Sequence, residues 1–106
     1  MNSENRSKLL QAARACFTNP NTKVAFFCSS QQSVRDVLSY VDNSEDIWED
    51  VLIKHKTGEI LFNNGSSIFV SAPQRIMGIE AHKVIFDEED SIPYELKQHL
   101  RTRERL

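Results

Sequence analysis

The chain has 106 residues, of which 40% are hydrophobic and 26% charged, and its formal net charge at pH 7 is −2. This length predicts one domain with a modest core, and the composition is typical of an ordinary globular protein. The small negative charge excludes a general electrostatic attraction to nucleic acid or to an anionic membrane.

No membrane span and no secretion signal are predicted. Every apolar run is far shorter than the roughly 20 residues that a transmembrane helix needs, and residues 1–5 lack the apolar centre of a signal peptide. Cys16 and Cys28 stand alone in apolar segments, without the paired spacing of a zinc site. We therefore expect reduced, buried cysteines in a cytoplasmic protein with no membrane partner.

The first predicted element is an amphipathic helix over residues 6–17, which Pro20 prevents from continuing. Its apolar residues share one side of a 3.6-residue period: Leu9, Leu10, Ala13, Cys16 and Phe17. Residues 23–28 follow as a short, continuous apolar run. Such a run is typical of a central parallel strand that is covered on both faces.

A second helix is predicted after this strand. Ser29 and Gln32 have the Ser-x-x-Gln spacing of a capping box, and apolar residues then recur at helical intervals: Val34, Val37, Leu38 and Val41. The following residues 42–50 are mostly acidic or polar. We interpret Trp48 as a packing anchor rather than a stacking platform for bases, because no basic residue flanks it.

Residues 59–62 and 66–71 predict two strands around the turn sequence Asn63-Asn64-Gly65. Asparagine and glycine tolerate positive φ angles, so this segment is predicted to be a β-hairpin. The three histidines are too scattered to form a ligand set, and we expect surface or edge positions for them: His55, His82 and His99.

Residues 83–86 are predicted to form a strand that leads directly into four acidic residues at 87–90. This is the form of a Walker B segment, in which the first acid holds Mg²⁺ and the next polarises the attacking water. Asp87 and Glu88 would take these two roles. The alternative is a buried strand that runs into an acidic surface turn.

Ser91 and Pro93 predict the start of a last helix, on which Leu96 and Leu100 share a face. Four cations follow at helical spacings: Lys97, Arg101, Arg103 and Arg105. They are typical of a solvated helix end, where the helix dipole favours positive charge. The alternative, a nucleic-acid contact, has less support because no aromatic residues are interleaved with the arginines.

The order of these elements predicts an α/β sheet, and several segments make the comparison specific. Residues 61–68, then Ser71-Ala72-Pro73, then Gly78, and finally residues 84–88 resemble the ATPase domain of the large terminase subunits that package DNA in tailed bacteriophages. The resemblance implies a truncated P-loop NTPase-like sheet, mainly parallel with an attached β-hairpin and with helices on both faces. Residues 1–106 would then be a single, partial terminase-like ATPase domain.

The resemblance also implies Mg²⁺ and ATP as cofactors, with Asp87 as metal ligand and Glu88 as catalytic residue. The family has a glycine-rich Walker A loop ahead of its first helix, whereas this chain has no glycine before Gly58. Arg6 and Ser7 stand where that loop ends, and they would offer the nucleotide a charge and a hydroxyl. Met77 occupies the place of an arginine that usually precedes the loop glycine, and Arg75 lies two residues earlier.

From these departures we expect a fragment or degenerate relative of the packaging ATPase that does not hydrolyse ATP on its own. A second copy or a partner protein would cover the sheet edge left by the missing Walker A strand. DNA would be contacted only through a larger assembly, in the cytoplasm of the host cell. The alternative is a small phage-encoded, non-enzymatic module that inhibits or regulates a host or viral protein.

Overall fold

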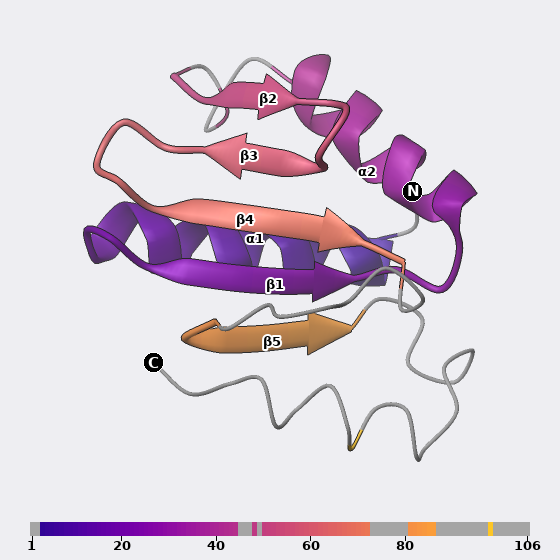
Figure 1. Ribbon diagram of the computed structural model, residues 1–106, viewed down its shortest axis with the longest axis horizontal. Coiled ribbons are helices and arrows are strands. Elements are labelled where there is room, and N and C mark those ends of the chain that lie inside the picture. Colours follow the sequence, from indigo (N-terminus) through magenta and orange to yellow (C-terminus); the bar gives the residue numbers. More distant parts are fainter. Residues whose placement is uncertain (1–2, 45–47, 49, 73–80, 87–97, 99–106) are drawn as a thin grey trace.

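The fold of this chain is given by a computed structural model, which describes residues 3–44, 48, 50–72, 81–86 and 98. Its elements are α1 (Ser3–Thr18), β1 (Lys23–Phe27), α2 (Gln31–Asp42), β2 (Leu52–Lys54), β3 (Glu59–Leu61), β4 (Ser67–Ser71) and β5 (Lys83–Phe86). Figure 1 shows the strands side by side in one twisted sheet with the helices packed against it. Within the described ranges, no helix has the length and apolar character needed to cross a membrane.

The five strands lie in the order β2-β3-β4-β1-β5. β1 is parallel to both of its neighbours, β4 and β5, whereas β3 runs antiparallel to β4, and β2 antiparallel to β3. The expected α/β class and the β3–β4 hairpin are therefore confirmed. The sheet is mixed rather than mainly parallel, because β2 extends the hairpin by a further antiparallel strand.

β1 is buried on both faces, as its continuous apolar sequence predicts. Val24 and Phe26 point into the larger of two apolar clusters, whereas Ala25 and Phe27 point into a smaller cluster on the opposite face. Alternate residues of a strand face opposite sides of the sheet, so an apolar run without polar interruptions is what such a position requires. The prediction of a central strand is confirmed.

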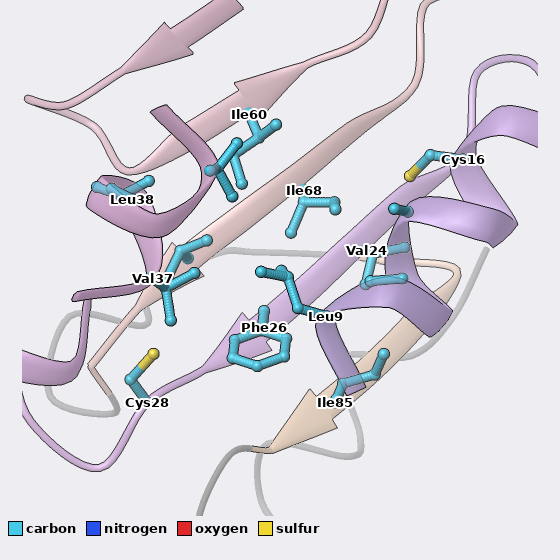
Figure 2. Close-up of a cluster of buried hydrophobic side chains, with 14 of the residues drawn as sticks. Leu9, Cys16, Val24, Phe26, Cys28, Val37, Leu38, Ile60, Ile68 and Ile85 are labelled. Carbon is cyan, nitrogen blue, oxygen red and sulfur yellow. The ribbon is translucent and has the colours of Figure 1, made fainter. Parts of the chain in front are cut away.

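Both described helices pack on the same face of the sheet. α1 and α2 direct their apolar rows into the larger cluster, where they meet Val24, Phe26 and Ile68 of the central strands (Figure 2). The buried residues of α1 are Asn5, Leu9, Ala12, Ala13 and Cys16, and those of α2 are Val34, Val37, Leu38 and Val41. The predicted third helix, which was to give helices on both faces, lies outside the described residues except for position 98.

The start of α2 differs from the expected capping box by one residue. Ser30, in an extended conformation, is the N-cap, and its Oγ accepts a hydrogen bond from the Ser33 backbone N–H at 3.2 Å. Ser29 and Gln32 therefore do not form the capping pair. An N-cap side chain accepts from the amide two or three residues later, so either of two consecutive serines can serve as the cap. The path of the chain that leaves β1 decides between them.

Trp48 is buried, with its ring centroid 6.3 Å from that of Phe62. The interpretation of Trp48 as a packing anchor is confirmed. It joins the larger cluster, as does Phe62, which directly follows β3.

Candidate functional site

The ends of the three parallel strands define one edge of the sheet, which we call the carboxyl edge. β1, β4 and β5 all finish there, at Phe27, Ser71 and Phe86. α1 precedes β1 and α2 follows it, and each runs back against the direction of β1, so both helices also begin at this edge (Figure 1). The carboxyl edge of such a sheet is where ligands of open α/β folds bind.

One hydrogen bond joins α1 to the last strand at this edge. Nζ of Lys8, in the second turn of α1, donates to the backbone carbonyl oxygen of Phe86 at 2.9 Å. Phe86 is the last residue of β5 and directly precedes Asp87 in the sequence. The first two turns of α1 therefore lie beside the point where β5 ends.

The predicted site residues divide into two groups. Arg6 and Ser7 are exposed on α1, within two residues of Lys8, and so belong to the carboxyl edge. Asp87 and Glu88 lie outside the described residues, and their predicted roles stay predictions. The same holds for the predicted glycine loop at Gly78 and for the terminal basic cluster.

The electrostatic character of this edge suits an anion. Both helices begin here, and the N–H groups in the first turn of a helix carry a partial positive charge. Arg6 and Lys8 add two formal charges, partly balanced by Glu4, whose Oε1 lies 3.5 Å from Lys8 Nζ. A phosphate group is the kind of ligand that such a positive edge attracts.

The described residues contain no group of three or more His, Cys, Asp or Glu side chains that could hold a metal ion. The chemistry of the donors that follow β5 in the sequence nevertheless fits Mg²⁺, which prefers carboxylate oxygens. Asp87 would be the residue to hold it, next in sequence to Glu88, for which a catalytic role is predicted.

The asparagine-glycine turn that contributes to the resemblance lies at the opposite edge of the sheet. This turn joins β3 to the start of β4, and β4 is five residues long, so roughly 16 Å of strand separates it from the carboxyl edge. The structure therefore does not bring Asn64 or Ser66 to the carboxyl end of β5. The contacts of this turn instead contribute to the packing of the domain.

Asn64 and Ser66 tie the hairpin to the end of α1. Asn64 Nδ2 donates to the Cys16 carbonyl oxygen at 2.7 Å, and Asn64 Oδ1 accepts from the Ser66 backbone N–H at 3.0 Å. The buried Ser66 hydroxyl donates to the Asn19 carbonyl oxygen at 2.8 Å. The carbonyl groups of the last turn of a helix have no partner within the helix, and Asn64 supplies one from a distant element.

We expect Asn64→Ala to lower the free energy of unfolding by about 2 kcal/mol, because the partly buried Cys16 carbonyl would lose its side-chain partner. Urea denaturation followed by circular dichroism measures this. Asn63→Ala, at an exposed position in the same turn, is the matched control, with an expected change within about 0.5 kcal/mol. Equal effects of the two substitutions would show that the contact with Cys16 is not important.

Cys16 and Cys28 are both buried and neither forms a disulfide bond, as predicted. Desolvation raises the pKa of the Cys16 thiol to about 12, so this thiol stays protonated near neutral pH. A protonated, buried thiol is neither a nucleophile nor a metal ligand. Cys16 therefore contributes to packing rather than to the chemistry of the site.

Sequence reasoning missed Lys8 as a member of the site. Its neighbours Arg6 and Ser7 were selected by their place relative to a known motif, and Lys8 falls outside that motif. The contact to Phe86 joins residues 78 positions apart, which no periodicity or spacing could indicate. The sequence feature that could have indicated Lys8 as a site residue was its position directly after Ser7.

Comparison with known proteins gives one family match. A family model described as the terminase large subunit, T4likevirus-type, N-terminal, matches residues 9–106. The match includes the asparagine-glycine turn, β5 and the acids that follow it, and begins just after Arg6, Ser7 and Lys8. Neither the curated proteins nor the solved structures that were compared gave a match to this chain.

Proposed function

Because the chain belongs to the family of T4likevirus-type terminase large subunit N-terminal domains, we propose that it forms the acidic half of the nucleotide site of a bacteriophage DNA-packaging ATPase. In this proposal Asp87 is the metal ligand and Glu88 orients and polarises the attacking water. Arg6 and Ser7 face the nucleotide with a positive charge and a hydroxyl. A bound Mg²⁺ would neutralise charge on the phosphate oxygens.

The observation that carries the proposal is the contact between Lys8 Nζ and the Phe86 carbonyl oxygen. It places the end of β5, which Asp87 and Glu88 follow in the sequence, next to the first turns of α1. A phosphoryl-transfer site needs cations and helix N–H groups near the residue that holds the metal. The carboxyl edge supplies these from elements that are far apart in the sequence.

Residues 1–106 do not supply a glycine-rich phosphate loop, since the first glycine is Gly58. Positive residues at the carboxyl edge attract phosphate, but they do not replace a loop of backbone N–H groups preorganised around it. Removal of even one preorganised donor typically costs about 10²- to 10³-fold in rate. We propose that the loop comes from outside residues 1–106 or from a partner chain, and that these residues alone do not hydrolyse ATP.

The test compares the isolated chain with its native assembly. We expect the purified 106-residue chain to release no phosphate from Mg²⁺-ATP above background, whereas an assembly purified from the native cell does so. Asp87→Asn and Glu88→Gln should each lower the rate of the assembly at least about 100-fold. Asp50→Asn, which changes an exposed acid away from the carboxyl edge, is the control and should leave the rate unchanged.

Two results would contradict the proposal. Turnover by the isolated chain at rates of about 1 s⁻¹ or faster would show that it carries a complete site. Unchanged activity of the assembly with both Asp87→Asn and Glu88→Gln would exclude the acids from catalysis. The second result would favour the alternative of a non-enzymatic module that binds a host or viral protein, because the acids would then be dispensable.

A further inference from the structure

We propose that Asn64 is a site of spontaneous deamidation, which the folded domain suppresses and which local opening of the β3–β4 hairpin makes reactive. Asn64 is the one asparagine in the sequence that glycine follows. Glycine has no side chain to obstruct its backbone nitrogen, so this nitrogen reaches the preceding carboxamide easily. The turn that contains both residues lies at the edge of the sheet opposite the carboxyl edge.

Water is the only co-reactant that the deamidation requires. The backbone nitrogen of Gly65 attacks Cγ of Asn64, so that a bond forms between these two atoms and the bond from Cγ to Nδ2 breaks. Nδ2 leaves as ammonia with the proton that the Gly65 nitrogen gives up. Water then opens the cyclic imide at one of its two carbonyl carbons. The product is aspartate, or isoaspartate when the main chain continues through Cγ.

Two hydrogen bonds hold the attacking group in the folded chain. The peptide unit between Asn64 and Gly65 is planar, so its carbonyl oxygen and its N–H move together. The oxygen accepts from the Asn21 backbone N–H at 3.3 Å, and the N–H donates to the Phe62 carbonyl oxygen at 3.3 Å. The attack removes the proton that is donated to Phe62, and it needs a peptide plane that is free to turn toward the side chain.

The carboxamide under attack is held at both ends. Its Nδ2 donates to the Cys16 carbonyl oxygen at 2.7 Å, which keeps the leaving nitrogen against α1. Its Oδ1 accepts from the Ser66 backbone N–H at 3.0 Å, which polarises Cγ but fixes the plane of the carboxamide. Gly65 is exposed and Asn64 only half-buried, so water has access to the turn. The hydrogen bonds, rather than burial, therefore protect Asn64.

The hairpin has to separate from the end of α1 before Asn64 becomes reactive. The buried Ser66 hydroxyl stabilises the same contact, because it donates to the Asn19 carbonyl oxygen at 2.8 Å and accepts from the Thr22 backbone N–H at 3.0 Å. Native proteins open locally, and a reaction that needs the open form follows its equilibrium population when closing is fast. The rate of deamidation at Asn64 therefore measures how often the hairpin leaves α1.

The product does not restore the contact with α1. In aspartate, a carboxylate oxygen replaces Nδ2 opposite the Cys16 carbonyl oxygen, and a pair of acceptors cannot form a hydrogen bond. In isoaspartate, the main chain gains a methylene group directly before Gly65, whose φ of +87° belongs to the original turn. Deamidation thus turns a transient opening of the hairpin into a permanent change.

The first experiment incubates the full chain at neutral pH, in buffer and in urea above the unfolding transition. Proteolytic digestion and tandem mass spectrometry measure the conversion of each asparagine, with Asn43 and Asn63 as internal controls that glycine does not follow. We expect Asn64 to react faster than both controls in urea, and at least about tenfold more slowly in the folded chain than in urea. Equal rates in the two conditions, or no reaction of Asn64 in urea, would overturn the proposal.

The second experiment weakens the contact without changing the reactive pair. Ser66→Ala removes the hydroxyl, and we expect the ratio of the rate in buffer to the rate in urea to rise about tenfold. Ser39→Ala, at an exposed position of α2, is the matched control, with an unchanged ratio expected. An unchanged ratio in Ser66→Ala would show that the contact with α1 does not protect Asn64, and would overturn the proposal. If circular dichroism shows that Ser66→Ala is unfolded, Ser66→Cys takes its place, because a thiol is a weaker donor and acceptor.

A third comparison tests whether the product destabilises the hairpin. Asn64→Asp has the side chain of one product, and Asn63→Asp adds the same charge at an exposed position of the same turn. We expect Asn64→Asp to lower the Tm more than Asn63→Asp does, because only the first loses the donor to Cys16. Equal Tm values of the two variants would refute the permanent change.

Discussion

Replacing Phe26 by alanine is expected to lower the free energy of unfolding by about 4 kcal/mol, which is a large part of the 5 to 15 kcal/mol typical of a domain. Phe26 is fully buried on the central strand. Its ring lies in the larger apolar cluster with residues of α1, α2 and the neighbouring strands (Figure 2). The substitution removes most of a large side chain and leaves a cavity that elements fixed in a sheet cannot close.

Chemical denaturation monitored by tryptophan fluorescence measures this effect, since Trp48 belongs to the same cluster. Phe17→Ala is the matched control. Phe17 is 46% exposed and touches Phe62 edge-to-face, with a centroid distance of 5.0 Å. We expect Phe17→Ala to lower the free energy of unfolding by about 1 kcal/mol. Similar destabilisation by the two substitutions would contradict the assignment of Phe26 to the centre of the core.

Gly58→Ala is expected to destabilise the fold by about 3 kcal/mol or more, from a positive φ and the loss of a buried main-chain hydrogen bond. Gly58 has φ +76° and closes the turn between β2 and β3, where its N–H donates to the Lys54 carbonyl oxygen at 2.9 Å. Its own carbonyl accepts from the Val70 N–H at 2.7 Å. A Cβ at this position would lie 2.2 Å from the Val70 carbonyl oxygen, so main chain would have to move.

Gly65→Ala is a matched comparison, because its φ of +87° is equally unfavourable for alanine. There the added Cβ would meet Asn21 Oδ1, which is the end of a side chain that can rotate away. We therefore expect a cost of about 1 to 2 kcal/mol, mainly from the backbone conformation. Thermal unfolding of both variants measures the difference in their stability. Equal losses of stability in Gly58→Ala and Gly65→Ala would show that the close approach to Val70 does not contribute.

The helices, the central strand and the hairpin were predictable because each is specified by local patterns. β2 was not predicted, since it has only three residues and forms by pairing with β3, Ile53 opposite Ile60. The capping residue of α2 was misplaced by one position for a related reason, since Ser29 and Ser30 are equivalent in sequence. The side of the sheet on which each helix packs also depends on connections that periodicity does not encode.

The sequence by itself determined the family, the alternation of helices and strands, and the acidic segment that follows β5, because residue type and spacing record these directly. Only the tertiary structure decided which of these features lie together. It placed the start of α1 at the end of β5 through Lys8, and it placed the asparagine-glycine turn at the far edge, where Asn64 binds the end of α1. Contacts between residues 78 and 48 positions apart arise from the packing of a helix across a sheet, and no local pattern specifies them.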